Sequence, residues 1–339
     1  MWLVRPATHD DLDGILGLLQ LAQANPVSST LPATAEGVSE KIAQSVQALS
    51  GAVNPDAGQR LLFVLQASDT GAIRGVAGID GRAGNGQPFY NYRQDSLIHA
   101  SHALGISRRV QVLYPSHSLT GLTLLCAFLI DPDLVGTDAF ELLSRARLLF
   151  IASHRSWFTD ETVVELAGVK HDSGAVPFWD SLGRHFFNMD FDTADGHSGA
   201  LSKTFIAELM PPNPIYVTLL TEDAQQALGV PHDRARPSFE LLQREGFQCG
   251  EYIDVFDGGP VLEARTNALK SVITSHRKAL RASEREDGDL CLLATGTGAA
   301  FRCTLAKVVD TLDDAIQAPL AALNVLGCQS GADAWVTPL

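Results

Sequence analysis

The order of apolar and polar positions predicts strands and helices that alternate along the whole chain. A short apolar strand over residues 2–5 precedes Thr8, a favourable helix-capping residue, and acidic side chains fill the turn after it. Apolar residues then recur at helical spacing from Leu12 to Leu19. Residues 60–81 hold two apolar runs joined by an Asp-Thr-Gly turn. The first quarter of the chain therefore predicts a strand, a helix and a β-hairpin.

The middle of the chain continues this alternation. We predict a polar, aromatic loop over residues 82–105 and a pair of strands within residues 110–131. Helical spacing marks residues 138–150, and an apolar run marks a buried strand at 162–169. Pro177 suits the first turn of a further helix. The buried face of that helix is predicted to hold Phe178, Trp179, Leu182 and Phe186. This order of elements is that of a GNAT-like acyl-CoA N-acyltransferase domain, an α+β fold.

The last third of the chain suggests two further parts. Residues 236–247 repeat the helix and the glycine–aromatic ending of residues 176–187, and a strand follows them. This echo indicates either a second, tandem GNAT-like half or convergent packing of a helix against a strand. Beyond a charged linker, short strands with glycine turns are typical of a small β-barrel. We therefore predict a GNAT-like acyltransferase domain over 1–195, a second GNAT-like half or completing segment over 196–284, and a barrel over 285–339.

Composition and charge narrow the class of protein. Hydrophobic residues make up 45% of the 339 positions and charged residues 19%, which is typical of a folded, soluble chain. A net charge of −14 argues against binding to nucleic acid or to a membrane surface. No apolar run approaches the roughly 18 residues that span a bilayer, and the charged N-terminus is unlike a signal peptide. Five widely spaced cysteines indicate reduced thiols, so we expect a cytoplasmic protein.

Three blocks of aromatic, Gly and Pro residues carry the most specific information. They are VPFWDSLGRHFF at 176–187, FIAELMPPNPIYV at 205–217 and YIDVFDGGP at 252–260. Together they resemble the arginine N-succinyltransferases, and the resemblance extends over residues 2–339. It implies an enzyme that transfers a succinyl group from succinyl-CoA to the α-amine of arginine or ornithine, in arginine catabolism. Succinyl-CoA would be a co-substrate, and no other cofactor is implied.

The resemblance also implies a partner and a role for two residues. Residues 133–154 and 262–272 look like the α-subunit type of arginine/ornithine N-succinyltransferase, which implies a hetero-oligomer with a paralogous β-type chain, or else a homo-oligomer. His232, in ALGVPHDRA, falls at the family's general acid, and Phe128 falls on a strand position that contacts succinyl-CoA. The ordinary alternatives are a loop histidine bonded to a carbonyl group and an apolar strand residue of the core.

Other charged and aromatic residues are candidates for the amino-acid substrate. Glu165 on a buried strand, together with Asp254, could hold the guanidinium group of arginine by paired, charge-assisted hydrogen bonds. Asp257 lies in an Asp-Gly-Gly sequence, which favours a turn or a cap. Tyr90 and Arg93 belong to the aromatic stretch and form a candidate substrate loop.

Two weaker patterns complete the set of candidates. Residues 28–30 loosely match a family segment that would border the substrate. His99 and His102 are three apart on a predicted helix, a spacing that can bind a metal ion. No third ligand follows them, so coincidence is the better explanation and we expect no metal site.

The segment over residues 131–147 departs from the family pattern. The family has Asp-Pro-Asp-Trp-Arg and then a Gly-x-Gly turn, whereas this chain has Val135 for the arginine, and Asp138 and Phe140 for the two glycines. Asp138 would place a negative charge where the pyrophosphate of CoA is expected. The departure leaves an alternative to the enzyme: a catalytically weak or silent subunit that stabilises or regulates a paralogous β-type chain.

Overall fold

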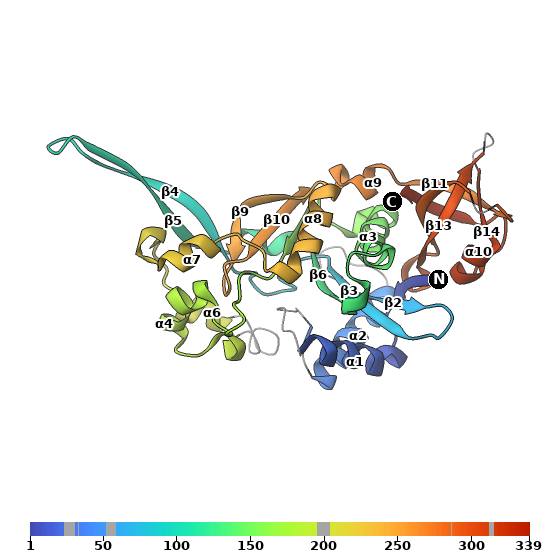
Figure 1. Ribbon diagram of the computed structural model, residues 1–339, viewed down its shortest axis with the longest axis horizontal. Helices are drawn as coiled ribbons and strands as arrows, with labels where there is room; N and C mark the ends of the chain where they lie inside the picture. Colours follow the sequence, from blue (N-terminus) through green and yellow to red (C-terminus); the bar gives the residue numbers. More distant parts are fainter. Residues whose placement is uncertain (24–30, 33, 52–58, 195–203, 286, 312–314) are drawn as a thin grey trace.

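The structure is a computed structural model, shown in Figure 1. It describes residues 1–23, 31–32, 34–51, 59–194, 204–285, 287–311 and 315–339. The described strands are β1 (Trp2–Pro6), β2 (Arg60–Ala67), β3 (Ile73–Asp80), β4 (Asn91–Ser101), β5 (Ile106–Ser116), β6 (Thr123–Ile130), β7 (Glu161–Glu165), β8 (Ile215–Tyr216), β9 (Gln248–Asp254), β10 (Pro260–Arg265), β11 (His276–Ser283), β12 (Asp289–Thr295), β13 (Arg302–Asp310), β14 (Ala315–Pro319) and β15 (Asp333–Pro338). The described α-helices are α1 (Leu12–Gln23), α2 (Ala35–Ser50), α3 (Asp138–Ser153), α4 (Arg184–Phe187), α6 (Thr204–Leu209), α7 (Glu222–Ala227), α8 (Arg236–Glu245), α9 (Lys270–Ile273) and α10 (Leu320–Leu326). None of these helices combines the length and the apolar character needed to cross a lipid bilayer.

One mixed sheet forms the centre of the molecule. In the order β1-β2-β3-β6, neighbouring strands are antiparallel, whereas β6 and β7 are parallel, and β10 and β9 then continue the sheet in antiparallel fashion. A parallel pair needs a long crossover connection, and α3 supplies it between β6 and β7. Segments far apart in sequence therefore meet in one layer, with β7 placed between β6 and β10.

Helices cover both faces of this sheet because side chains alternate along its strands. On β2, Leu61, Phe63 and Leu65 pack in the cluster that contains the apolar face of α3. Leu62 and Val64, between them, pack with residues of α1 and α2 on the opposite face. Figure 1 shows α3 on one side of β2 and β3, and α1 and α2 on the other. The predicted strand, helix and hairpin of the first quarter, and the helix from residue 138, are confirmed.

The predicted loop over residues 82–105 is wrong. β4 and β5 are eleven-residue strands that pair from Asn91↔Ser116 to Ser101↔Ile106, and they project from one end of the molecule (Figure 1). Both strands predicted within residues 110–131 are present, as β5 and β6, but they do not form a pair: β5 pairs with β4 and β8, and β6 pairs with β3 and β7. The tip of this hairpin is exposed on both faces and needs no apolar alternation. Its polar sequence therefore looks like that of a loop.

The predicted helix from Pro177 contains a wider turn. Residues Trp179–Gly183 form a π-helix, and only the four residues of α4 follow. The extra residue in that turn shifts the buried face, so Phe187 is 6% exposed whereas Phe186, predicted to be buried, is 40% exposed. Gly183 is required here, because a Cβ atom at this position would lie 2.3 Å from the Trp179 ring. Burial of Phe178, Trp179 and Leu182 is confirmed.

The predicted C-terminal β-barrel is confirmed. Its five strands run in the order β12-β15-β11-β14-β13, and pairing of β12 with β13 closes the ring. The barrel begins before the predicted boundary at residue 285, because β11 pairs with β14 and β15. β13 also pairs with β1 at Val4↔Cys303, which joins the barrel to the central sheet.

His154 at the end of α3 makes a second connection to the barrel. Its Nε2 atom accepts a hydrogen bond of 3.0 Å from the Gly298 N–H, and Nδ1 lies 3.1 Å from the Phe150 carbonyl oxygen. Because Nε2 accepts, the ring must be neutral with its proton on Nδ1. Burial lowers the pKa of His154, which favours this neutral form.

His154 is expected to make stability dependent on pH. Because its folded pKa lies below the unfolded value of about 6.5, its contribution is complete above that pH and is lost as pH falls towards the folded value. The loss should be on the order of 1 kcal/mol, the size of one hydrogen bond. Urea unfolding at pH 7.5 and pH 5.5 measures it. His154→Gln is the matched control, because its amide oxygen can accept the Gly298 N–H without titrating. Equal pH dependence in both proteins would contradict the prediction.

Candidate active site

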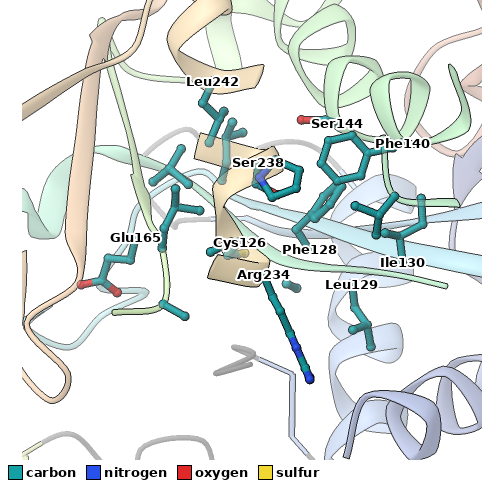
Figure 2. A pocket seen from close by; sticks show the side chains of 18 of the residues that line it. Cys126, Phe128, Leu129, Ile130, Phe140, Ser144, Glu165, Arg234, Ser238 and Leu242 are labelled. Carbon is teal, nitrogen blue, oxygen red and sulfur yellow. The ribbon is translucent and has the colours of Figure 1, made fainter. Parts of the chain in front are cut away.

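A cavity lies where β6 and β7 stop pairing. The two strands are paired only from Thr123↔Thr162 to Leu125↔Val164. Beyond these pairs, a cavity of about 390 Å³ is lined by the rest of β6, the end of β7, α3, α8 and part of α1. Most of its lining side chains are apolar, and Glu165, Arg234 and Ser144 are among the few polar ones (Figure 2). Concave apolar sites with a few polar groups are typical of small-molecule binding.

A β-bulge shapes the wall that β6 contributes to this cavity. Val76 pairs with Leu129 and Gly78 pairs with Cys126, so Ala127 and Phe128 together oppose the single residue between them on β3. Ala127 has a φ of +51°, a left-handed conformation that costs a non-glycine residue roughly 1–2 kcal/mol. Phe128 lines the cavity, and its ring packs edge-on against Phe140 at 5.3 Å. The CoA contact that the family resemblance implies for Phe128 stays a prediction. Strain of this kind is often found at ligand sites.

Glu165 provides a carboxylate at the opposite end of the cavity from Ile130 (Figure 2). It is the last residue of β7, and its Oε1 atom accepts a hydrogen bond of 2.6 Å from the Asn91 side chain. Asn91 is fully buried and is paired across the sheet with Asp254. The sheet therefore fixes the Glu165 carboxylate at the edge of an otherwise apolar cavity.

His232 borders the cavity through its main chain. Its N–H donates to the Ala167 carbonyl oxygen at 2.8 Å, and Ala167 lines the cavity. Its Nδ1 atom accepts from the Arg234 N–H at 3.1 Å and caps the short helix Asp233–Ala235. Burial, followed by the charge of Arg234, lowers the pKa of His232, although a hydrogen bond with the Lys170 backbone opposes the shift. The ring is therefore neutral at pH 7 and lies beside the lining rather than in it.

Asp254 and Asp257 form a turn behind this region. Asp254 Oδ1 accepts from the N–H groups of Phe256 and Asp257, at 2.7 and 2.9 Å. Asp257 is buried and accepts from the N–H groups of Gly168 and Gly259, both at 2.7 Å. Burial, followed by the nearby Asp254, raises the pKa of Asp257 well above its ordinary value. Asp257 thus serves a turn, as predicted, and Asp254 reaches the cavity only through its strand partner Asn91.

Tyr90 immediately precedes β4 and Arg93 lies within it, and neither residue lines the cavity. The Tyr90 ring packs edge-on towards His117, at 6.3 Å between ring centroids. Arg93 donates to Asp95 at 3.3 Å, and its side chain is 43% exposed. The structure therefore brings Phe128 and Glu165 together, places His232 and Asp254 next to them, and leaves Arg93 at the surface.

The altered segment before α3 lies at one side of the cavity. Val135 and Phe140 line it, whereas Asp138 is the exposed first residue of α3. Gly136 has a φ of +76°, so a glycine is kept immediately before the helix. The first N–H groups of a helix have no partners within it and favour an anion. The N-terminus of α3 therefore lies beside the cavity, and one glycine precedes it in a different register from the two glycines of the family pattern.

Some features of the site were missed by the sequence analysis. Arg147 and Asn91 are buried polar residues at the cavity or beside it. The two arginines within the largely apolar run LLSRARLLFIA of α3 are the signal that could have identified Arg147. The predicted helix for His99 and His102 is wrong, since His99 belongs to β4 and His102 to the turn after it. Within the described ranges, no group of three His, Cys, Asp or Glu side chains could hold a metal ion. Residues 28–30 lie outside the described residues.

Comparison with known proteins identifies the family to which this chain is similar. The family described as "Arginine N-succinyltransferase beta subunit" matches residues 2–271, and its C-terminal domain matches residues 276–338. The chain is 40% identical to arginine N-succinyltransferase subunit alpha of Pseudomonas aeruginosa over 338 residues, 98% of each chain. It is 36% identical to arginine N-succinyltransferase of Escherichia coli over 334 residues, 98% of this chain and 96% of that one.

A solved structure gives the same result. Arginine/ornithine succinyltransferase subunit AI from Pseudomonas aeruginosa superimposes with a TM-score of 0.90 at 35% identity, covering 100% of this chain and 98% of that one. The match therefore includes the β4–β5 hairpin and the barrel as well as the central sheet. Sequence and structure agree, and the resemblance carried by the three sequence blocks is confirmed: the chain belongs to the arginine N-succinyltransferase family.

Proposed function

We propose that this chain is an arginine N-succinyltransferase, which transfers the succinyl group of succinyl-CoA to the α-amine of arginine or ornithine. The observation that carries the proposal is the cavity between β6 and β7 in a chain of this family. The Escherichia coli relative bears that activity in its name, and the solved relative is an arginine/ornithine succinyltransferase subunit. Succinyl-CoA is a co-substrate, and the reaction needs no other cofactor.

The separated strands offer a place for the pantetheine arm of CoA. Beyond Leu125↔Val164 the facing edges of β6 and β7 no longer pair with each other, and the cavity lies in the gap between them. The strand backbone around Phe128, at the bulge, would hold the thioester, and the N-terminus of α3 would receive the pyrophosphate. In this arrangement the thioester, the pantetheine arm and the pyrophosphate follow one another from the interior of the cavity to its rim, in the same order as in acyl-CoA.

The acyl transfer follows from the groups that border the cavity. The amine nitrogen attacks the thioester carbon, the C–S bond breaks, and the amine proton ends on the departing sulfur. Neutral His232 would accept that proton and pass it on, while Glu165 in the lining attracts the cationic substrate and Asp254 adds negative charge from behind Asn91. Tyr90 and Arg93 would border its approach. Cys126 is an unsuitable nucleophile, because burial raises the pKa of its thiol to about 12.

We assign residues 196–284 to the completion of one GNAT-like domain. The support is that β7 pairs along its whole length with β10, so β10 and β9 extend the first sheet. A tandem copy would be expected to pair mainly within itself. The domain from residue 1 and the segment from residue 196 then form one cavity, to which α8 contributes Ser238 and Leu242.

We also infer an association with another chain of this family, either a paralogous β-type subunit or a second copy. The β4–β5 hairpin exposes Ile98, Leu104 and Ile106 at 67%, 73% and 46%. A two-stranded hairpin is marginally stable alone, so a partner that covers these residues would stabilise it.

No observation favours the silent-subunit alternative. All five cysteines are free thiols, which fits a cytoplasmic enzyme.

The function is tested by succinyl-CoA calorimetry and arginine-dependent CoA release on the purified chain. Ser238→Phe is expected to weaken binding at least tenfold, because it fills the cavity from a half-buried position on α8. Ser238→Ala, at the same position, should bind normally. If the Ser238→Phe variant binds succinyl-CoA as tightly as the wild type, the succinyl-CoA site does not lie in this cavity. Activity that appears only after a β-type chain is added would support the silent-subunit alternative.

Asp138→Asn is expected to tighten succinyl-CoA binding about two- to tenfold at low salt, because it removes a negative charge from the proposed phosphate site. The gain should shrink as salt rises, since Asp138 is exposed. Calorimetry at two salt concentrations measures both effects. Asp133→Asn, a nearby exposed aspartate in the preceding turn, is the matched control. Equal gains from the two variants would contradict a specific phosphate site at α3.

A further inference from the structure

Arg147 on α3 is a buried cation that lines the cavity. It is 3% exposed, and burial lowers the pKa of its guanidinium group to about 10, so it is still charged at neutral pH. Nε and Nη2 donate to the Ser144 carbonyl and hydroxyl oxygens, both at 3.2 Å, and Nη1 donates to the Cys126 carbonyl oxygen at 3.4 Å. These are long hydrogen bonds to neutral acceptors.

Arg145, two residues earlier in the same helix, is a buried arginine that does have carboxylates as charge partners. Its Nε atom lies 2.9 Å from the Glu245 carboxylate and 3.5 Å from that of Glu141. Among the described residues, no carboxylate forms an ion pair with Arg147. Instead, its guanidinium group stacks on the Phe128 ring, 5.0 Å from the ring centroid. A buried charge without an opposite partner costs several kcal/mol, so a ligand that brings a carboxylate would gain from this residue.

The position of Arg147 in the cavity indicates which carboxylate group of the substrates would pair with it. It donates to the backbone of Cys126, next to the bulge, and stacks on Phe128 within it, where the proposed function puts the thioester. The other charged groups of the lining differ: Glu165 would repel an anion, and Arg234 is exposed. An acyl chain that enters from the thioester therefore meets one buried cation within an apolar wall.

We propose that Arg147 binds the free carboxylate of the acyl group, so that the cavity selects acyl-CoA thioesters with a terminal carboxylate over neutral ones of the same length. This inference rests on the proposed function and adds the residue that sets acyl specificity. A planar guanidinium group matches a carboxylate by paired hydrogen bonds. A desolvated cation also rejects a methyl group at the same point, because the cation would then remain without a partner of opposite charge.

The test compares succinyl-CoA with butyryl-CoA, which has a methyl group in place of the carboxylate. The wild-type chain should prefer succinyl-CoA at least 100-fold in kcat/KM. Arg147→Met, an uncharged side chain of similar length, should lose about 10- to 100-fold on succinyl-CoA and little or nothing on butyryl-CoA. Arg147→Lys should recover part of the preference. Free CoA should bind the wild type and both variants equally, which shows that the cavity is intact.

Several outcomes would overturn the proposal. An equal loss on both thioesters would make Arg147 a packing residue, while normal CoA binding would leave the proposed function standing. No CoA binding by the wild type would overturn both. A higher KM for arginine in Arg147→Met, without the same change for agmatine, would assign the residue to the carboxylate of the amino acid instead.

Discussion

Glu245→Ala is expected to lower the free energy of unfolding by about 3–5 kcal/mol, the cost of leaving a buried charge without its partner. Glu245 is fully buried at the end of α8, 2.9 Å from Arg145 of α3. It also accepts from the Ser271 N–H at 2.8 Å and from the Ser271 hydroxyl at 2.9 Å. One carboxylate therefore joins α3, α8 and α9, and its loss leaves a buried cation and two buried donors. Urea unfolding followed by circular dichroism measures the change.

The double variant Arg145→Met with Glu245→Met is the informative control. Replacing both members of a buried pair by apolar residues is often neutral or stabilising, so the double variant should recover most of the loss. If the loss of unfolding free energy in the double variant equals the sum of the losses in the two single variants, the residues contribute by packing alone. The comparison separates the ion pair from the volume of its side chains.

His232→Ala is expected to lower kcat about 10²- to 10⁴-fold, the usual contribution of a positioned proton-transfer group. Succinyl-CoA should still bind with nearly unchanged affinity, because the side chain does not line the cavity. The change also removes the cap on the Arg234 N–H, which costs on the order of 1 kcal/mol of stability. Arginine-dependent CoA release at saturating substrate, together with thermal unfolding, measures both effects.

His232→Asn separates catalysis from capping. Asparagine is as good a capping residue, and its side-chain oxygen can accept the Arg234 N–H. It cannot transfer a proton at neutral pH, so activity should remain as low as in His232→Ala while stability returns. An Asn variant with activity within threefold of the wild type would mean that His232 is a loop histidine held by its neighbours. The same result would remove the proton-transfer step from the proposed mechanism.

Local patterns were enough to predict much of the central sheet. The continuous apolar run of β2, the turn after it and the helical spacing of α3 each reflect interactions between residues close in sequence. Phe128 and Glu165 were predicted to be strand residues, and they lie on β6 and β7 beyond the last pair between the two strands, Leu125↔Val164. The family resemblance supplied the chemistry that these patterns do not contain.

The remaining features depend on contacts between distant residues. The β4–β5 hairpin has exposed faces and so lacks the apolar alternation that marks a strand. The π-helical turn at Trp179–Gly183 moves the buried face by one residue, a shift that helical spacing does not predict. Arg145 finds Glu245 a hundred positions away, whereas Arg147 finds no such partner among the described residues. Two arginines two residues apart thus have different roles, and only their surroundings distinguish them.

The place of β1 in the sheet has a consequence for folding during synthesis. β1 lies between β2 and β13, and its Trp2 carbonyl oxygen accepts a hydrogen bond from the Thr304 hydroxyl, 302 positions later. Until the last part of the chain has left the ribosome, the first strand is an open sheet edge with unpaired backbone groups. Such edges pair readily with other chains, and contacts over so long a separation form slowly. A ribosome-bound chain that lacks the barrel should therefore need protection from a chaperone.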